Sequence, residues 1–238
     1  MKKINFLFVS LIILSGCNNK KDERYINNLD TVNNILYNCI EEYNKVLEYE
    51  ETSILKEGSN SINSILKFND NKKEFYYCIS DQEEQEEIYA FFQDEYYYEL
   101  DNVEKEAEKK LATGKGIDEW LEYRDQAYSN LDTIVSSEIT LLELIKPLLE
   151  SNREIIGFDI VCDSRDSISF SIDNYEIEEG IISFEIVIEN YLLTSLSTSI
   201  DNISSSININ YSSNIILPNI EDYEIKDPLK DINNGLFN

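Results

Sequence analysis

The apolar positions in the first part of the chain recur at helical intervals. Spacings of three and four alternate from residue 29 to residue 46, which places the apolar side chains on one stripe of a helix. The members of this stripe are Leu29, Val32, Leu36, Cys39, Tyr43 and Val46. The pattern predicts a long first helix with a coiled-coil-like apolar face.

Turn signals divide the stretch that follows. Gly58-Ser59-Asn60-Ser61 ends the first helix, and Asn69-Asp70-Asn71 predicts a turn after a shorter helical piece that carries Ile62 and Leu66. Residues 75–79, Phe-Tyr-Tyr-Cys-Ile, fit either a helix or a strand. We interpret them as helix.

Two further long helices are predicted before residue 150. Ser80 is a suitable N-cap, and Glu83 three residues later completes a capping box. Thr113-Gly114-Lys115-Gly116 ends this helix, and the last helix begins near Ile117 and kinks or ends at Pro147. The apolar stripe of the helix that starts at residue 80 consists of Ile88, Phe92, Tyr96, Leu100, Val103, Ala107 and Leu111.

After residue 151 the period of the apolar positions changes from about 3.6 to 2, which is typical of strands. Alternation predicts strands within 156–160, 167–172, 182–188 and 203–211, whereas 191–200 fits either a short helix or a strand. The fold class is therefore α+β. We expect an elongated antiparallel helical bundle over residues 25–151, followed by a small antiparallel β-sheet over 152–217 packed on one face, and a polar tail over 218–238.

The first 17 residues have the pattern of an export signal. Lys2 and Lys3 precede the apolar run Ile4–Leu14, which is shorter than the roughly 20 residues that span a bilayer. The run ends in Leu14-Ser15-Gly16-Cys17, which resembles the lipobox of bacterial lipoproteins. An ordinary cleaved secretory signal with an incidental Cys is the alternative.

The lipobox resemblance implies a location and an anchor. In lipoproteins the signal peptide, here residues 1–16, is removed and the new N-terminal Cys, here Cys17, carries acyl chains such as palmitate. Residues 17–24 would then be a lipidated tether to the membrane. Asn18 after the lipidated position is typical of outer-membrane delivery if the organism has an outer membrane. Otherwise the resemblance implies the outer face of the cytoplasmic membrane.

A second resemblance covers about half the chain. Residues 25–149 resemble the helical domain of an uncharacterised family of bacterial lipoproteins. The matching positions are Tyr25-Ile26, Glu42-Tyr43-Asn44, Tyr96-Tyr97 and Gly114-Lys115-Gly116. The resemblance implies a helical fold but no activity.

Composition excludes several kinds of site. The chain has 238 residues, no His, and 47 acidic against 20 basic side chains, a formal net charge of −27. Catalytic triads and zinc sites that require His are impossible, and nucleic acid is not an expected partner because its binding depends on Lys and Arg. Beyond Cys17 there are three cysteines, so at most one disulfide can form within the mature chain.

Two segments resemble ligand sites only in part. Gly114-Lys115-Gly116 lacks the spacing and the preceding strand of a phosphate-binding loop, so a turn between helices explains it better. Asp159, Asp163, Ser164 and Asp166 carry calcium-binding side chains, but the Gly and the last Glu of an EF-hand loop are missing. We therefore expect neither a cofactor nor a metal.

The tyrosines at 96–98 are the candidate binding residues. On a helix, Tyr96, Tyr97 and Tyr98 would point about 100° apart and could not all face one core. A sandwiched helix explains this, and so does a partly exposed aromatic patch that binds a cationic partner beside the surrounding acids. The leading hypothesis is a non-enzymatic, lipid-anchored envelope protein that binds a protein or other ligand. The alternatives are a His-free carboxylate hydrolase of envelope polymers and a structural spacer.

Overall fold

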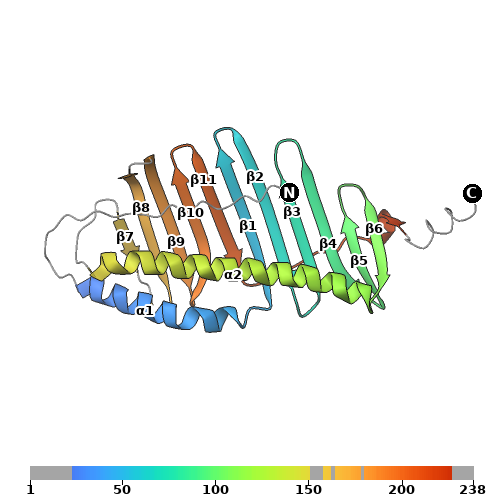
Figure 1. The fold of residues 1–238 in the computed structure, drawn as a ribbon, viewed down its shortest axis with the longest axis horizontal. Coiled ribbons are helices and arrows are strands. Elements are labelled where there is room, and N and C mark those ends of the chain that lie inside the picture. Colours follow the sequence, from blue (N-terminus) through green and yellow to red (C-terminus); the bar gives the residue numbers. More distant parts are fainter. Residues whose placement is uncertain (1–22, 151–157, 162–163, 178–179, 227–238) are drawn as a thin grey trace, which may run out of the picture.

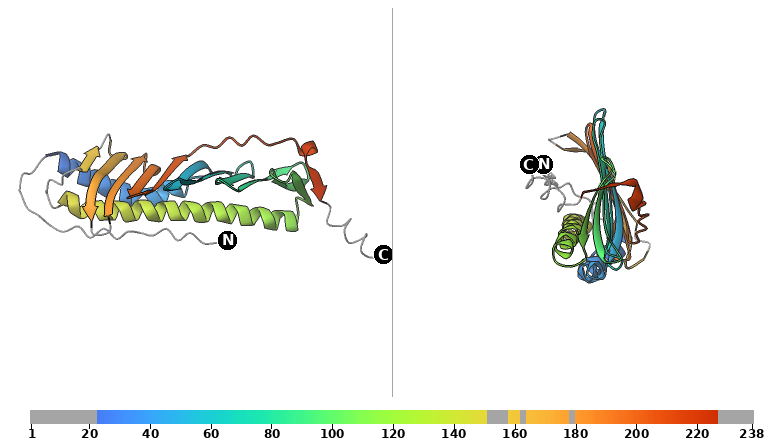
Figure 2. Two further views of the ribbon diagram at one scale, coloured as in Figure 1. Left: turned by 90° about the horizontal axis from the view of Figure 1, so that it is seen from above. Right: turned by 90° about the vertical axis from the view of Figure 1, so that its right-hand side faces the viewer.

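One helix lies on one face of a single long β-sheet, and a second helix lies beside it at the lower ends of the strands (Figures 1 and 2). The computed structural model describes residues 23–150, 158–161, 164–177 and 180–226. Helix α1 spans Glu23–Tyr43 and helix α2 spans Lys115–Glu150. The helices run side by side along the sheet, and α2 crosses most of its strands (Figure 1).

The sheet has 12 strands in the order β12-β6-β5-β4-β3-β2-β1-β11-β10-β9-β8-β7. All neighbours are antiparallel except β12 and β6, which are parallel. Pairing of β1 with β11, from Glu50↔Asn210 to Glu57↔Ile203, joins the two halves of the chain into one sheet. The strands are β1 Glu48–Glu57, β2 Asn60–Asn69, β3 Glu74–Ser80, β4 Gln85–Gln93, β5 Tyr96–Asp101, β6 Glu106–Leu111, β7 Phe158–Val161, β8 Ile168–Ile177, β9 Gly180–Glu189, β10 Leu192–Ile200, β11 Ile203–Asn210 and β12 Glu224–Lys226.

The prediction of an elongated helical bundle followed by a small sheet is wrong. Residues 48–111 form six strands rather than helices, so neither the predicted coiled coil nor a helical domain over 25–149 is present in the described residues. The predicted cap at Ser80 is the end of β3, where the Asp81 carboxylate instead accepts from the backbone N–H groups of Glu83 and Glu84 at 2.7 and 2.8 Å. This local turn competes with helix formation.

Other elements agree with the sequence patterns. The first predicted helix corresponds to α1 only as far as Tyr43, because residues 48–57, predicted as its continuation, form β1. The last predicted helix corresponds to α2, and the strands predicted within 167–172, 182–188 and 203–211 lie in β8, β9 and β11. Residues 192–200, which were ambiguous, form β10, and part of 156–160 lies in β7. Pro147 lies inside α2, which continues to Glu150, so the helix does not end at this residue.

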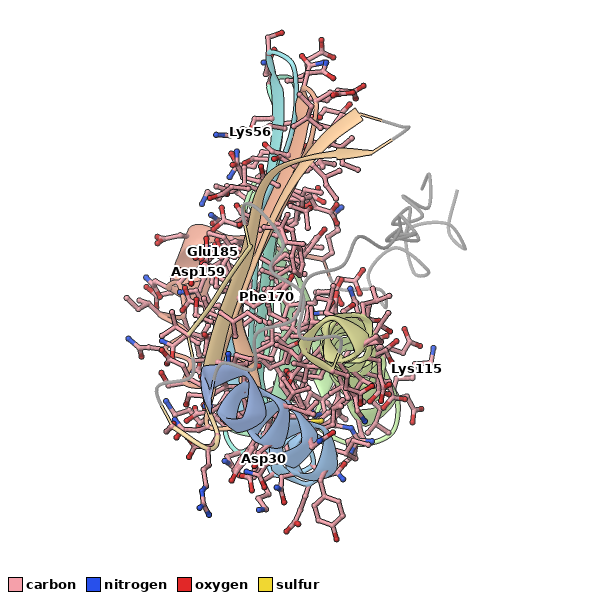
Figure 3. All side chains as sticks on the ribbon, turned by 90° about the vertical axis from the view of Figure 1, so that its left-hand side faces the viewer. Asp30, Lys56, Lys115, Asp159, Phe170 and Glu185 are labelled. Atoms are coloured by element: carbon pink, nitrogen blue, oxygen red, sulfur yellow. The ribbon has the colours of Figure 1, made fainter. Side chains whose placement is uncertain are left out.

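The main core lies between the helices and the sheet. Aromatic side chains on neighbouring strands, such as Tyr49, Phe68 and Phe75, are fully or almost fully buried against α2. The Phe68 ring stacks on that of Trp120, with centroids 6.2 Å apart. Seen along the sheet, Phe170 points towards the helices, whereas Asp159 and Glu185 lie on the opposite face (Figure 3).

A second, smaller core lies on the opposite face of the sheet. It consists of Phe91, Tyr98, Leu100, Ala107 and Tyr223. Tyr223 belongs to the segment after β11, which runs along the face opposite α2 towards η1 (Ile220–Asp222) and β12 (Figure 2). The parts of β4 and β5 next to this core are therefore buried on both faces. In the polar tail predicted to start at residue 218, Tyr223 is buried, whereas β12 is exposed.

Candidate functional site

The structure places the three predicted binding tyrosines on strand β5, where successive side chains point to opposite faces. Tyr97 is fully buried on the α2 side, and Tyr98 is buried in the second core. Tyr96 is half-buried, and the Lys109 amine lies 3.7 Å from its ring centroid. The three rings therefore do not form one exposed patch. Cys17 lies outside the described residues.

The partial motifs of the sequence form turns. Gly114 accepts hydrogen bonds from the backbone N–H groups of Ile117 and Asp118, so residues 114–116 connect strand β6 to α2 rather than two helices. The Asp166 carboxylate accepts from the hydroxyls of Ser164 and Ser167. Asp163 lies outside the described residues, and within them no group of three or more side chains could hold a metal ion.

A groove of about 230 Å³ lies between α1 and α2. Its apolar side chains include Ile40 from α1 and Leu131 and Val135 from α2, and Asp132 adds a carboxylate. Ile40 is 54% exposed, and Tyr37, one turn earlier on α1, is 86% exposed. Tyr43, Asn44 and Tyr128 complete the lining. The groove is therefore an accessible site with both apolar and polar lining, within an acidic molecule.

Beneath the groove, a buried carboxyl group joins both helices to the sheet. Glu138 on α2 is fully buried, and its Oε2 accepts from the Tyr43 hydroxyl at 2.8 Å and from the backbone N–H of Leu193 at 3.1 Å. Leu193 lies at a register shift between β10 and β9, where a bulge re-aims its N–H. The Tyr211 hydroxyl donates to the Leu193 carbonyl at 2.7 Å and lies 3.2 Å from the Tyr43 hydroxyl. We call Glu138, Tyr43, Tyr211 and Leu193 the Glu138 junction.

The environment of Glu138 favours its neutral form. Burial raises the pKa of its carboxyl group to about 7, although the Tyr43 and Leu193 hydrogen bonds act in the opposite direction. The second oxygen, Oε1, has no hydrogen-bond partner. Burial, and then the neighbouring Glu138, also raise the pKa of the Tyr43 hydroxyl and of the Cys39 thiol. Ionisation of Glu138 would therefore carry a high free-energy cost.

Other carboxyl groups lie along the same helix–sheet interface. Asn130 on α2 donates to Glu51 on β1, whose pKa is raised by burial. Tyr97 donates to Glu99 at 3.2 Å, and burial raises the pKa of Glu99 as well. These groups are partly exposed, whereas Glu138 is completely enclosed.

Sequence reasoning missed Glu138, although the chain carries a signal for it. Glu138 is four residues after Ile134 and four before Leu142, two apolar positions on the same face of the predicted last helix. An acid at a core position of an amphipathic helix indicates a buried polar contact. Its partners Tyr43, Leu193 and Tyr211 are far away in the sequence, so no local pattern connects them.

Comparisons with known proteins place few constraints on this site. The chain matches no family model, and no curated protein matches it. Among solved structures it is similar to LprF from Mycobacterium bovis, with 12% sequence identity, a TM-score of 0.34, and coverage of 79% of this chain and 96% of that chain. A similarity at this level transfers neither residues nor roles.

Within the described residues, neither helix is long and apolar enough to span a membrane.

Proposed function

We propose that this chain is a lipid-anchored protein of the bacterial envelope that binds a basic protein partner in the groove between α1 and α2 and catalyses no reaction. The observation that carries the proposal is the groove itself, because it combines apolar and polar lining residues with the exposed side chain of Ile40 and lies next to the exposed Tyr37. Exposed aromatic and aliphatic side chains beside a groove are typical of protein interfaces.

The size of the groove favours a protein partner over a small molecule. Small-molecule sites usually enclose about 300–1,000 Å³, and the groove holds about 230 Å³. A cavity of this size suits one or two anchoring side chains, and a few such anchors supply most of the affinity of an interface.

Charge favours a basic partner. The net charge is −27, and Asp132 lies in the groove. Glu41, next to Ile40 on α1, is 74% exposed and pairs with the exposed Lys45 at 3.4 Å. Opposite charge accelerates association and selects among partners. An acidic partner, including a second copy of this chain, would be repelled.

The anchor rests on the lipobox Leu14-Ser15-Gly16-Cys17. We expect Cys17→Ser to abolish lipid attachment and to release the protein from the membrane fraction, because the variant lacks the thiol that would carry the acyl chains. Fractionation followed by mass spectrometry of the N-terminus measures both effects. A variant that stays membrane-bound and normally cleaved would contradict the anchor.

The groove is tested with a defined probe, a fluorescent amphipathic helix built from Lys and Leu. We expect Ile40→Lys to weaken its binding about tenfold or more by fluorescence anisotropy, because the change places a charge on the apolar wall and opposes a basic ligand. Val103→Lys adds the same charge at a similarly exposed site, 45% against 54%, on the β5–β6 turn, and should bind like the wild type.

Two results would contradict the binding role. One is equal binding of the probe by both variants and the wild type. The other is equal binding of a Glu and Leu helix, since an acidic ligand should be repelled.

A further inference from the structure

The Glu138 junction has an unusual position in the fold. It lies where α1, α2 and β10 meet, and each element contributes one group: Tyr43, Glu138 and the Leu193 N–H. The Tyr43 hydroxyl is also within 3.0 Å of the Leu193 nitrogen, so all three groups contact one another. A change at Glu138 therefore acts on both helices and on the sheet.

No positive charge balances Glu138. The groups that face the junction are Cys39 and Tyr43 from α1, Tyr211 after β11, and Glu51 from β1, whose charge acts on Tyr211. None of them is basic, and none of the ion pairs in the described part of the chain includes Glu138. An ionised Glu138 would be a buried, uncompensated charge, which proteins relieve by protonation or by opening towards water.

The second carboxyl oxygen supports the same conclusion, although the hydrogen bonds to the first oxygen favour the charged form. The Tyr43 hydroxyl and the Leu193 N–H both donate to Oε2, whereas Oε1 is enclosed and has no hydrogen-bond partner. A neutral carboxylic acid tolerates one unpaired oxygen far better than a carboxylate does.

We propose that the Glu138 junction is a proton-dependent latch: protonated Glu138 holds α1 and α2 against β10, and its ionisation releases them. Release occurs as the pH rises through neutrality, where this carboxyl group titrates. The latch also regulates the groove, a consequence that rests on the proposed function, because Tyr43 belongs both to the junction and to the groove lining. The groove keeps its shape only while Glu138 is protonated.

Hydrogen exchange of the intact mature protein without any ligand tests the latch. Amide protection in α1 and β10 is compared at roughly pH 5.5 and roughly pH 8.5, after correction for intrinsic exchange rates. We expect the protection factors of the wild type to fall about tenfold or more at the higher pH. The hairpins of β3–β6, which lie far from the junction in the sheet order, should keep their protection.

Neutral variants separate the latch from general effects of pH. We expect Glu138→Gln and Glu138→Met to keep α1 protected at both pH values. Two neutral variants are used so that the test remains possible if one of them does not fold. Glu143→Gln removes an exposed carboxylate from the same helix and should behave like the wild type. Equal protection of wild-type α1 at both pH values, or equal loss in the neutral variants, would overturn the latch.

Probe binding at the two pH values distinguishes failure of the latch from failure of the proposed function. If exchange shows the pH-dependent release but the Lys and Leu helix binds at neither pH, the binding role is wrong and the latch stands. If the helix binds equally at both pH values while α1 is released only at the higher one, the groove is not regulated by the junction.

Discussion

Gly116, at the start of α2, illustrates how a single residue limits the fold. A Cβ added at this position would lie 2.3 Å from the carbonyl oxygen of Leu111 and 3.0 Å from the Cβ of Tyr97. Both neighbours are held in strands, so neither can move aside easily. Gly114 differs, because it has a positive φ of 59° but open space around it.

We predict that Gly116→Ala destabilises the protein by about 1–3 kcal/mol, the usual cost of overpacking. Gly114→Ala is the control and should cost about 1 kcal/mol, because only the left-handed backbone conformation is penalised. Urea unfolding measured by circular dichroism gives both free energies. The steric explanation fails if Gly116→Ala is no more costly than Gly114→Ala.

The two glycines also show how far sequence reasoning reaches at the residue scale. A boundary between two elements near Gly114 follows from the sequence, but it separates β6 from α2 and not two helices, as was predicted. The close approach at Gly116 does not follow, because Leu111 and Tyr97 reach it only after β5 and β6 have paired. Glu138 is similar: its place in an apolar stripe is visible in the sequence, but its partners are not.

At the scale of elements, helices were predicted correctly where only one face of the segment is buried. α1 and α2 each pack on the core along one stripe and expose the other side, so their apolar period is close to 3.6. Strands β8, β9 and β11 alternate because the face away from the helices is polar, with Ser169, Glu185 and Ser206 among its residues.

Strands β3–β6 were mistaken for helices because they lack this alternation. Tyr97 and Tyr98 are both buried, one under α2 and the other in the second core, and Ala90 and Phe91 on β4 repeat the arrangement. Moreover, a spacing of four places residues on one face of a strand as well as of a helix. The pairs Ile88 and Phe92 on β4 and Tyr96 and Leu100 on β5 have this spacing, so the supposed helical stripe was formed by successive strands.

At the scale of the whole molecule, one long-range contact decides the architecture. β1 pairs with β11, about 150 residues later, and this pairing turns two groups of hairpins into one sheet. The hairpins themselves follow from local turns, whereas the pairing of two distant strands depends on the complete fold. The sequence therefore indicates strands in the second half, but it does not reveal that the first half extends the same sheet.

Because the whole molecule is acidic, its stability should depend on both pH and salt. Glu138 is protonated more readily in the folded state, where its pKa is about 7, than in the unfolded chain, where a Glu carboxyl group has an ordinary pKa of 4.5. A raised folded-state pKa stabilises the protein below the unfolded value, and this contribution is lost as the pH rises through about 7. Glu51 and Glu99 act in the same direction, and repulsion among the remaining carboxylates adds to the loss.

We predict that the melting temperature is highest in mildly acidic buffer and falls between about pH 5 and about pH 8, with a Glu138 contribution of roughly 3 kcal/mol at most. Added salt should reverse the part of the fall in melting temperature that arises from surface repulsion, since exposed charges are screened over about 8 Å at physiological ionic strength. It should not reverse the part that arises from ionisation of the buried Glu138. Glu138→Gln should therefore flatten the pH dependence at high salt, as calorimetry across the pH range would measure. If the variant at high salt still melts like the wild type at every pH, the pH dependence belongs to the surface charges, and Glu138 has no measurable part in it.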